Sequence, residues 1–102
     1  MNKQLTLLLI DDHQVLRKGL KDLLNDKLHI KEFNEAENAN QGYELFIKHV
    51  PDIIITDLSL AGASGLELIT KIRRRSPKAK IIVYTMHEEY FYAVQSLSAG
   101  AL

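Results

Sequence analysis

The sequence predicts an α/β domain built on a parallel sheet, and two observations lead to this prediction. Short apolar runs alternate along the chain with longer segments whose apolar residues recur at helical spacing. The connections between them are short, and no internal repeat, linker or low-complexity tract interrupts the alternation. Strands and helices that alternate in this way form parallel sheets with right-handed crossovers.

The first half of the chain predicts two strands and two helices. The run LTLLLI at 5–10 is apolar enough to be covered on both faces, whereas the strand at 30–36 is mixed with polar residues and suits a sheet edge. We expect a helix at 14–25 between these two strands. A second helix follows the second strand, with Asn40 as its capping residue, and ends near residue 49. The apolar stripe of the first helix comprises Val15, Leu16, Leu20, Leu23 and Leu24.

The second half continues the alternation. A buried strand is expected at 53–56, and a loop leads from it to a helix at 65–75. The run IIVY at 81–84 is apolar on both faces, as in an interior strand, although no fifth strand follows to cover it. A fourth helix is expected at about 89–99.

Composition is that of one soluble globular domain. The chain has 102 residues, of which 46% are hydrophobic and 25% charged. Formal net charge is zero, so no overall field attracts nucleic acid or a membrane surface. The chain has no cysteine, which excludes disulfides and fits a reducing compartment. No apolar stretch approaches the length of a membrane span, so we expect a cytoplasmic protein.

Acidic residues stand at the ends of two predicted strands. Asp11 and Asp12 close the first apolar run, and Asp57 closes the run IIITD. The carboxyl ends of neighbouring parallel strands meet at one edge of the sheet, where ligands bind. Clustered carboxylates repel one another, and a hard cation such as Mg²⁺ relieves that repulsion. Separately, each acid has a simpler interpretation, as a helix cap or a turn residue. Together they predict an acidic Mg²⁺ pocket.

Other polar and aromatic residues have ordinary interpretations. The four histidines lack metal-ligand spacing and are expected to be solvated or core residues: His13, His29, His49 and His87. The basic run at 71–80 is expected to be a solvated helix face, because no aromatic platform for nucleic acid is interleaved with it. For the aromatic run at 90–92 a partner surface and ordinary exposure both stay open.

Three stretches, LLLIDDH, IIITDLSLAGASGLEL and IIVYTMHEE, resemble the receiver domain of bacterial two-component response regulators. The resemblance covers essentially the whole chain. The stretches DDHQVLRKGL and TMHEEYFYAVQSLSAGA are similar to the NarL/LuxR-type subfamily, whose receivers usually precede a DNA-binding helix-turn-helix domain. The resemblance implies a flavodoxin-like, CheY-like sandwich with strand order 2-1-3-4-5.

The resemblance also assigns roles to individual residues. It implies that Asp57 accepts a phosphoryl group, and that Mg²⁺ is held by Asp12, Asp57 and the backbone carbonyl of Ser59, with Asp11 acting mainly through a bound water. It implies that the Thr85 hydroxyl contacts a phosphoryl oxygen as a switch. Without the resemblance, a strand-end threonine that bonds a backbone carbonyl is an equally good interpretation of Thr85.

One departure concerns the end of the sequence. The family's fifth strand carries an aromatic switch residue and a lysine that contacts the phosphoryl group, and a fifth helix follows it. Neither element occurs within the 102 residues. We therefore expect residues 1–102 to be a C-terminally incomplete receiver domain. Because the apolar run at 81–84 has no following strand to cover it, we also expect self-association through its edge or through the fourth helix.

The predicted function is that of a signalling receiver. A sensor histidine kinase would supply the phosphoryl group, slow hydrolysis would remove it, and DNA would be contacted only through an output domain that is absent from this sequence. Two alternatives remain. The chain could be a binding or self-association module that is not phosphorylated. It could also be a Mg²⁺-dependent phosphatase with an aspartyl nucleophile, but Ser59 stands where that mechanism needs a second acid.

Overall fold

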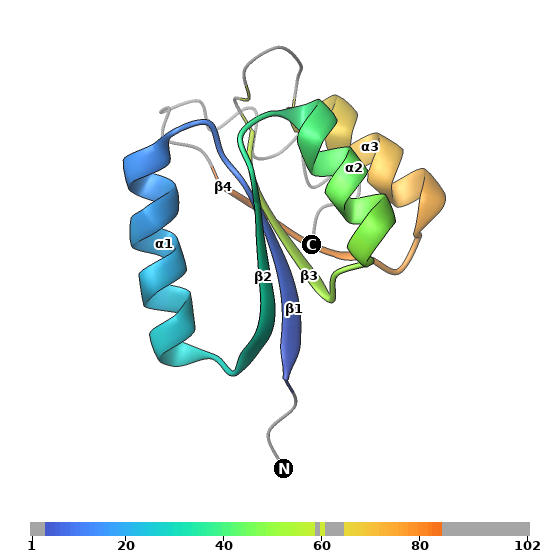
Figure 1. Ribbon diagram of the computed structural model, residues 1–102. Coiled ribbons are helices and arrows are strands. Elements are labelled where there is room, and N and C mark those ends of the chain that lie inside the picture. The colour runs from blue at the N-terminus through green and yellow to red at the C-terminus, as the bar shows by residue number, and fades with distance from the viewer. Residues whose placement is uncertain (1–3, 59, 61–64, 85–102) are drawn as a thin grey trace.

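The computed structural model describes residues 4–58, 60 and 65–84, and it arranges them in three layers (Figure 1). The elements in chain order are β1 (Leu5–Ile10), α1 (Gln14–Lys27), β2 (Ile30–Ala36), α2 (Ala39–His49), β3 (Ile53–Asp57), α3 (Gly65–Arg75) and β4 (Lys80–Tyr84). The predicted alternation is confirmed, and α3 has the bounds expected from the sequence. The helix expected at 89–99 lies outside the described residues.

The four described strands form one parallel sheet in the order β2-β1-β3-β4. Helix α1 covers one face of this sheet, and α2 and α3 cover the other (Figure 1). The polar strand β2 lies at an edge, as its composition predicts. The sheet order implied by the family resemblance is therefore confirmed over these strands.

The larger part of the core lies between the sheet and helices α2 and α3. Alternation along the strands directs Leu8, Ile10 and Ile54 to this side, where they pack with Phe46 of α2 and Ile72 of α3. Burial of such apolar side chains is the main stabilising term of the fold. This face therefore holds the sheet against two helices and fixes the positions of the strand ends.

The opposite face has a smaller core. Leu7, Leu9 and Ile55 are buried there, and Leu20 and Leu24 of α1 pack against them while remaining partly exposed. No residue of α1 is fully buried. Helix α1 lies over β1 and β2, so it covers mainly the part of this face that these two strands form.

The predicted apolar stripe of α1 is wrong at two positions. Val15 is 87% exposed and Leu23 is 54% exposed. The residues that face the sheet, Leu20 and Leu24, are four positions apart and form one row along the helix. Leu23 precedes Leu24 by one position, or about 100° around the helix, and Val15 precedes Leu20 by five positions, or about 140° away from the row, so both point away from the sheet.

Helix α2 begins two residues earlier than expected. Asn38, and not Asn40, is the N-cap residue: its backbone is extended and its side chain accepts a hydrogen bond from the backbone nitrogen of Gln41 at 2.8 Å. An N-cap side chain reaches the third residue beyond it, which is the spacing from Asn38 to Gln41. Asn40 lies inside the helix.

The apolar strand β4 is covered unequally on its two faces, in line with the expected loss of cover at 81–84. Ile81 is fully buried, but the next residue, Ile82, is 40% exposed. Successive strand residues point to opposite faces, so Ile81 faces the larger core and Ile82 the side of α1. Since α1 lies over β1 and β2, it leaves Ile82 partly open.

A reciprocal clasp joins the amino ends of β1 and β3. Asp52 Oδ2 accepts hydrogen bonds from the backbone nitrogen and the hydroxyl of Thr6, at 2.9 and 3.1 Å. In return the backbone nitrogen of Asp52 donates to the Thr6 hydroxyl and to the Thr6 carbonyl, at 2.9 and 2.8 Å. These four bonds tie the two central strands together at the end of the sheet where β1 and β3 begin.

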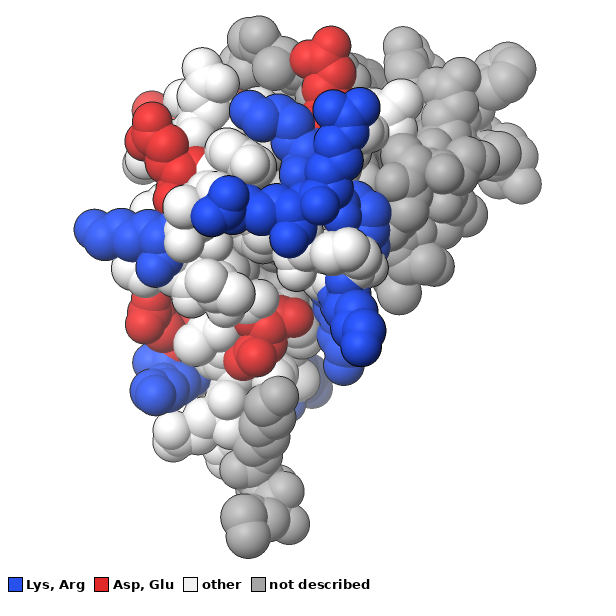
Figure 2. Space-filling model, turned by 90° about the vertical axis from the view of Figure 1, so that its right-hand side faces the viewer, with Lys and Arg blue, Asp and Glu red and all other residues white. Residues whose placement is uncertain are grey.

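The basic run at 71–80 lies on the surface. Figure 2 shows Lys and Arg side chains gathered over the face that includes α3. The exposed members of this basic patch are Lys71, Arg74, Arg75, Lys78 and Lys80. Arg73 is partly buried and donates hydrogen bonds to the carbonyls of Pro77 and Ala79. The exposed arrangement agrees with a solvated helix face. No described helix is long and apolar enough to cross a membrane.

Candidate metal centre at the carboxyl ends of the strands

The three acidic residues converge at one edge of the sheet. The register of β1 and β3 pairs Ile10 with Thr56, so Asp11 follows β1 at the level where Asp57 ends β3. Single ligand atoms of Asp11, Asp12, His13 and Asp57 all lie within 4.8 Å of one another. The strand ends therefore bring the acids together as their sequence positions predict.

Burial differs sharply among the three carboxylates. Asp11 is fully buried and Asp57 is 1% exposed. The Asp12 side chain is 30% exposed and borders solvent. A buried carboxylate is costly unless hydrogen bonds or opposite charge compensate for its lost hydration. The pocket must therefore supply donors to its two buried acids, whereas water reaches part of Asp12.

Asp11 receives a dense set of hydrogen bonds. Its Oδ1 accepts from the backbone nitrogen of His13 at 2.7 Å and lies 2.9 Å from His13 Nδ1. Its Oδ2 accepts a hydrogen bond from the hydroxyl of Tyr84. The backbone carbonyl of Asp11 accepts from Arg17 Nη1 at 2.6 Å. Both carboxylate oxygens and the carbonyl of Asp11 are thus engaged within the described residues.

His13 belongs to this pocket, which corrects its interpretation as an ordinary solvated or core histidine. Its side chain is 55% exposed, yet Nδ1 lies 3.0 Å from Asp12 Oδ1 and 3.8 Å from Asp57 Oδ2. The hydrogen bond to Asp11, followed by the charge of Asp12, raises the pKa of His13 above 6.5. Because carboxylates only accept hydrogen bonds, Nδ1 carries a proton here. The sequence feature that could have placed His13 in the pocket is its position directly after Asp12.

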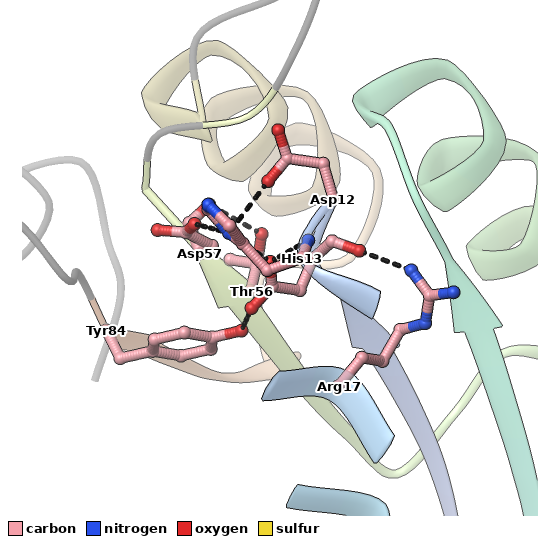
Figure 3. A network of polar contacts seen from close by, with 7 residues as sticks. Asp12, His13, Arg17, Thr56, Asp57 and Tyr84 are labelled. Atoms are coloured by element: carbon pink, nitrogen blue, oxygen red, sulfur yellow. Dashed lines mark hydrogen bonds and ion pairs between the residues drawn. The ribbon is translucent and has the colours of Figure 1, made fainter. Parts of the chain in front are cut away.

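Tyr84 is the second residue of the pocket that sequence reasoning missed. It ends β4 as the partner of Asp57 in the sheet, and its backbone carbonyl accepts a hydrogen bond from the Leu58 nitrogen at 2.9 Å. Figure 3 shows the Tyr84 ring pointing from β4 into the pocket, where its hydroxyl donates a hydrogen bond to Asp11. Burial, and then the hydrogen bond to Asp11, raise the pKa of Tyr84. The sequence feature that could have placed Tyr84 in the pocket is its position at the end of a strand, like that of Asp57.

The backbone carbonyl groups of Asp57 and Leu58 lie very close to Gly65, the first residue of α3. A Cβ atom at Gly65 would lie 2.5 Å from the Leu58 carbonyl oxygen and 2.8 Å from that of Asp57. The Gly65 nitrogen donates to the Leu58 carbonyl at 3.0 Å. Only glycine lets the helix approach the backbone this closely. Gly65 therefore helps to set the position of Asp57.

The donor set fits a hard divalent cation. Carboxylate oxygens are the ligands that Mg²⁺ prefers, and three of them face one small volume. The ring of His13 and the hydroxyl of Tyr84 lie against these carboxylates, and a protonated His13 offsets part of their negative charge. The predicted roles of Ser59 and Thr85 fall on residues outside the described part of the chain, and they stay predictions.

Comparison with known proteins identifies the family. The family model of the response regulator receiver domain matches residues 7–102, so the chain belongs to this family. The nitrate/nitrite response regulator protein NarL of Escherichia coli (strain K12) is 40% identical over 96 residues, which are 94% of this chain and 44% of that protein. The transcriptional activator protein ExaE of Pseudomonas putida is 33% identical over 95 residues, covering 93% of this chain and 44% of that protein. The chain thus spans less than half the length of these relatives.

Solved structures agree on the fold. A two-component response regulator of the LuxR family from Aurantimonas sp. SI85-9A1 superposes with a TM-score of 0.89 at 32% identity, over 97% of this chain and 71% of that one. The signal receiver domain of the putative response regulator NarL from Mycobacterium tuberculosis has a TM-score of 0.88 at 23% identity, over 97% of this chain and 80% of that one. At that lower identity the similarity concerns the fold alone.

Proposed function

Because this chain belongs to the response regulator receiver domains and is close to the NarL/LuxR type, we propose that Asp57 accepts a phosphoryl group from the phosphohistidine of a sensor histidine kinase. The observation that supports this most directly is the position of Asp57. Its carboxylate ends a central strand, is 1% exposed and shares the pocket with two further acids.

In the proposed reaction an Asp57 oxygen attacks phosphorus and forms a P–O bond, while the P–N bond to the kinase histidine breaks. The electron pair of that bond stays on the leaving imidazole, which takes up a proton. The product is an acylphosphate at the carboxyl end of β3. Water then releases phosphate and restores the carboxylate, so the chain acts as an acceptor that resets and turns over no separate substrate.

The residues of the pocket fit the cation that such chemistry needs. Asp12 and Asp57 would hold Mg²⁺ directly, together with the Ser59 carbonyl, and Asp11 would act through a bound water. When bound, the ion supplies positive charge that offsets the phosphoryl oxygens and orients them for in-line attack. His13 and Tyr84 support Asp11, and the Thr85 hydroxyl is proposed as the phosphoryl contact beyond β4.

Phosphorylation would control an output outside this chain. The added charge biases the domain between two conformations, and the similarity to NarL and ExaE suggests transcription regulation in a longer cytoplasmic protein. Contact with DNA would belong to a separate output domain, because net charge here is zero. The alternative of a module that is never phosphorylated is not favoured by the intact set of acids at the strand ends.

Replacement of the acceptor tests the proposal. Asp57→Asn should abolish labelling by acetyl phosphate or by a phosphorylated histidine kinase in the presence of Mg²⁺, because an amide is a far poorer nucleophile than a carboxylate. Asp26→Asn, an exposed site at the far end of α1, is the matched control and should label like the parent chain. Equal labelling of the Asp57→Asn and parent chains would place the acceptor elsewhere.

A further inference from the structure

Tyr84 gives this pocket a hydrogen-bond donor that comes from β4. We propose that the Tyr84 hydroxyl, by donating a hydrogen bond to the Asp11 carboxylate, compensates part of its charge and thereby lowers the affinity of the pocket for a divalent cation. The inference rests on the proposed Mg²⁺-dependent function. It adds to that function a residue that restrains metal binding and links it to β4.

The two oxygens of Asp11 have different partners. Oδ1 accepts from the backbone nitrogen of His13 at 2.7 Å and lies 2.9 Å from His13 Nδ1. Oδ2 accepts from the Tyr84 hydroxyl. Oδ2 is therefore the oxygen through which Asp11 would accept a hydrogen bond from a metal-bound water. A cation and its water must share Oδ2 with Tyr84 or displace the hydroxyl.

The orientation of Asp11 does not depend on Tyr84 alone. Asp11 is fully buried, its backbone nitrogen donates to the Ala36 carbonyl at 2.9 Å, and its Oδ1 is fixed by the rigid backbone of His13. Removing the tyrosine hydroxyl therefore leaves the carboxylate in place. What changes is charge compensation, because a donor that stabilised the anion is lost. A less compensated anion attracts a cation more strongly.

Tyr84 also connects the pocket to the sheet edge. Its carbonyl accepts from the Leu58 nitrogen next to Asp57, while its hydroxyl reaches Asp11 beyond β1. One residue of β4 therefore contacts the ends of both acid-bearing strands. A shift of Asp11 toward a bound cation would change the hydrogen bond of the Tyr84 hydroxyl and so would link metal binding to β4.

Magnesium titration of the 102-residue chain tests the affinity. We expect Tyr84→Phe to bind Mg²⁺ roughly three- to tenfold more tightly than the parent, the range set by losing one net hydrogen bond. The matched control is Tyr43→Phe, since Tyr43 lies on α2 with its ring against Phe46 and below Lys71, and should keep the parent affinity. Equal or weaker binding by Tyr84→Phe, with parent-like circular dichroism, would overturn the inference.

A double-mutant cycle separates the Tyr84–Asp11 bond from other effects of the substitution. In the Asp11→Ala background, Tyr84→Phe should change Mg²⁺ affinity by less than about twofold, because its acceptor is gone. In the parent labelled at tyrosine Cζ with ¹³C, Mg²⁺ should shift the Tyr84 signal and leave that of Tyr43 in place. An unmoved Tyr84 signal during saturable binding contradicts the inference alone. A parent chain that binds no Mg²⁺ contradicts the proposed function itself.

Discussion

His13 is the residue whose charge depends most directly on the acidic pocket. Its ring is half exposed, but the hydrogen bond to Asp11 and the charge of Asp12 both favour the protonated form. In its protonated form the ring also shields the three carboxylates from one another and so reduces their mutual repulsion.

This charge makes the stability of the metal-free chain depend on pH. The pKa of His13 is raised above 6.5 in the folded chain, so folding favours proton binding. The contribution of His13 to stability is fully present below pH 6.5 and is lost as pH rises through the folded pKa. NMR titration of the imidazole in EDTA should give a pKa above 6.5. In urea melts, the stability difference between the parent and His13→Gln should shrink from pH 6 to pH 9.

A titration at or below 6.5 would contradict this prediction. A stability difference between parent and His13→Gln that does not change with pH would do so as well, because it would assign His13 a packing role only.

The residues of the pocket also show where sequence reasoning stops. Asp11 and Asp57 could be placed together because strand ends and parallel pairing fix the positions of their backbones. His13 and Tyr84 could not, because their roles depend on the direction of side chains that cross between strand ends. A histidine after an acid pair and a tyrosine at a strand end both have common structural interpretations.

Among the elements, α3 matters most for the acceptor, because its first residue touches the backbone behind Asp57. The close approach of Gly65 to two carbonyl oxygens leaves no room for a side chain. Backbone atoms cannot rotate away as a flexible side chain can. Any larger residue must therefore move the start of α3 or the end of β3.

Gly65→Ala should destabilise the chain by about 1–3 kcal/mol, the usual cost of overpacking, and should slow the labelling of Asp57. Gly19→Ala is the matched control. Gly19 lies in the middle of α1, and a Cβ atom there would meet nothing within 4 Å, so alanine should stabilise the chain by roughly 0.5–1 kcal/mol. Urea unfolding and acetyl phosphate labelling of both variants check the pair. Unchanged stability of Gly65→Ala would show that the backbone relaxes without cost.

The positions of the helices and strands could be predicted closely from the periodicity of apolar residues. Which residues of each element face the core could be predicted less well. Apolar runs located β1, β3 and β4, and the mixed composition at 30–36 placed β2 at an edge of the sheet. Val15 and Leu23 were placed inward on α1 because apolar character was taken for burial. Asn38 and Asn40 are both good capping residues, and only the backbone geometry selects between them.

For the whole molecule, the two faces of the sheet contribute unequally. The side of α2 and α3 has many fully buried residues, whereas on the side of α1 only three are buried among those described. Ile72 is fully buried in the first cluster, and Leu24 is partly exposed against the second. The stability of the sheet therefore depends mainly on one face. Self-association through the β4 edge, where Ile82 is 40% exposed, stays a prediction.

The inequality can be measured by truncating one residue on each face. Ile72→Ala should cost about 2–5 kcal/mol, as usual for a large residue in a closed core. Leu24→Ala should cost less, roughly 1–2 kcal/mol, because part of its side chain is already in water and its site borders solvent. Equal costs in urea melts would show that both faces support the sheet alike.

The clasp between Thr6 and Asp52 sets the spacing of charges at the opposite end of the sheet. Partners in β1 and β3 are 46 positions apart in sequence from the clasp onward, and the same offset separates Asp11 from Asp57. The two strands therefore run in a constant register, with the same number of residues between the clasp and the acid in each. One residue inserted into either strand would carry its acid about 3.3 Å past the other and turn its side chain to the opposite face. The alignment of the acids thus depends on a register that the clasp fixes at the other end of the two strands.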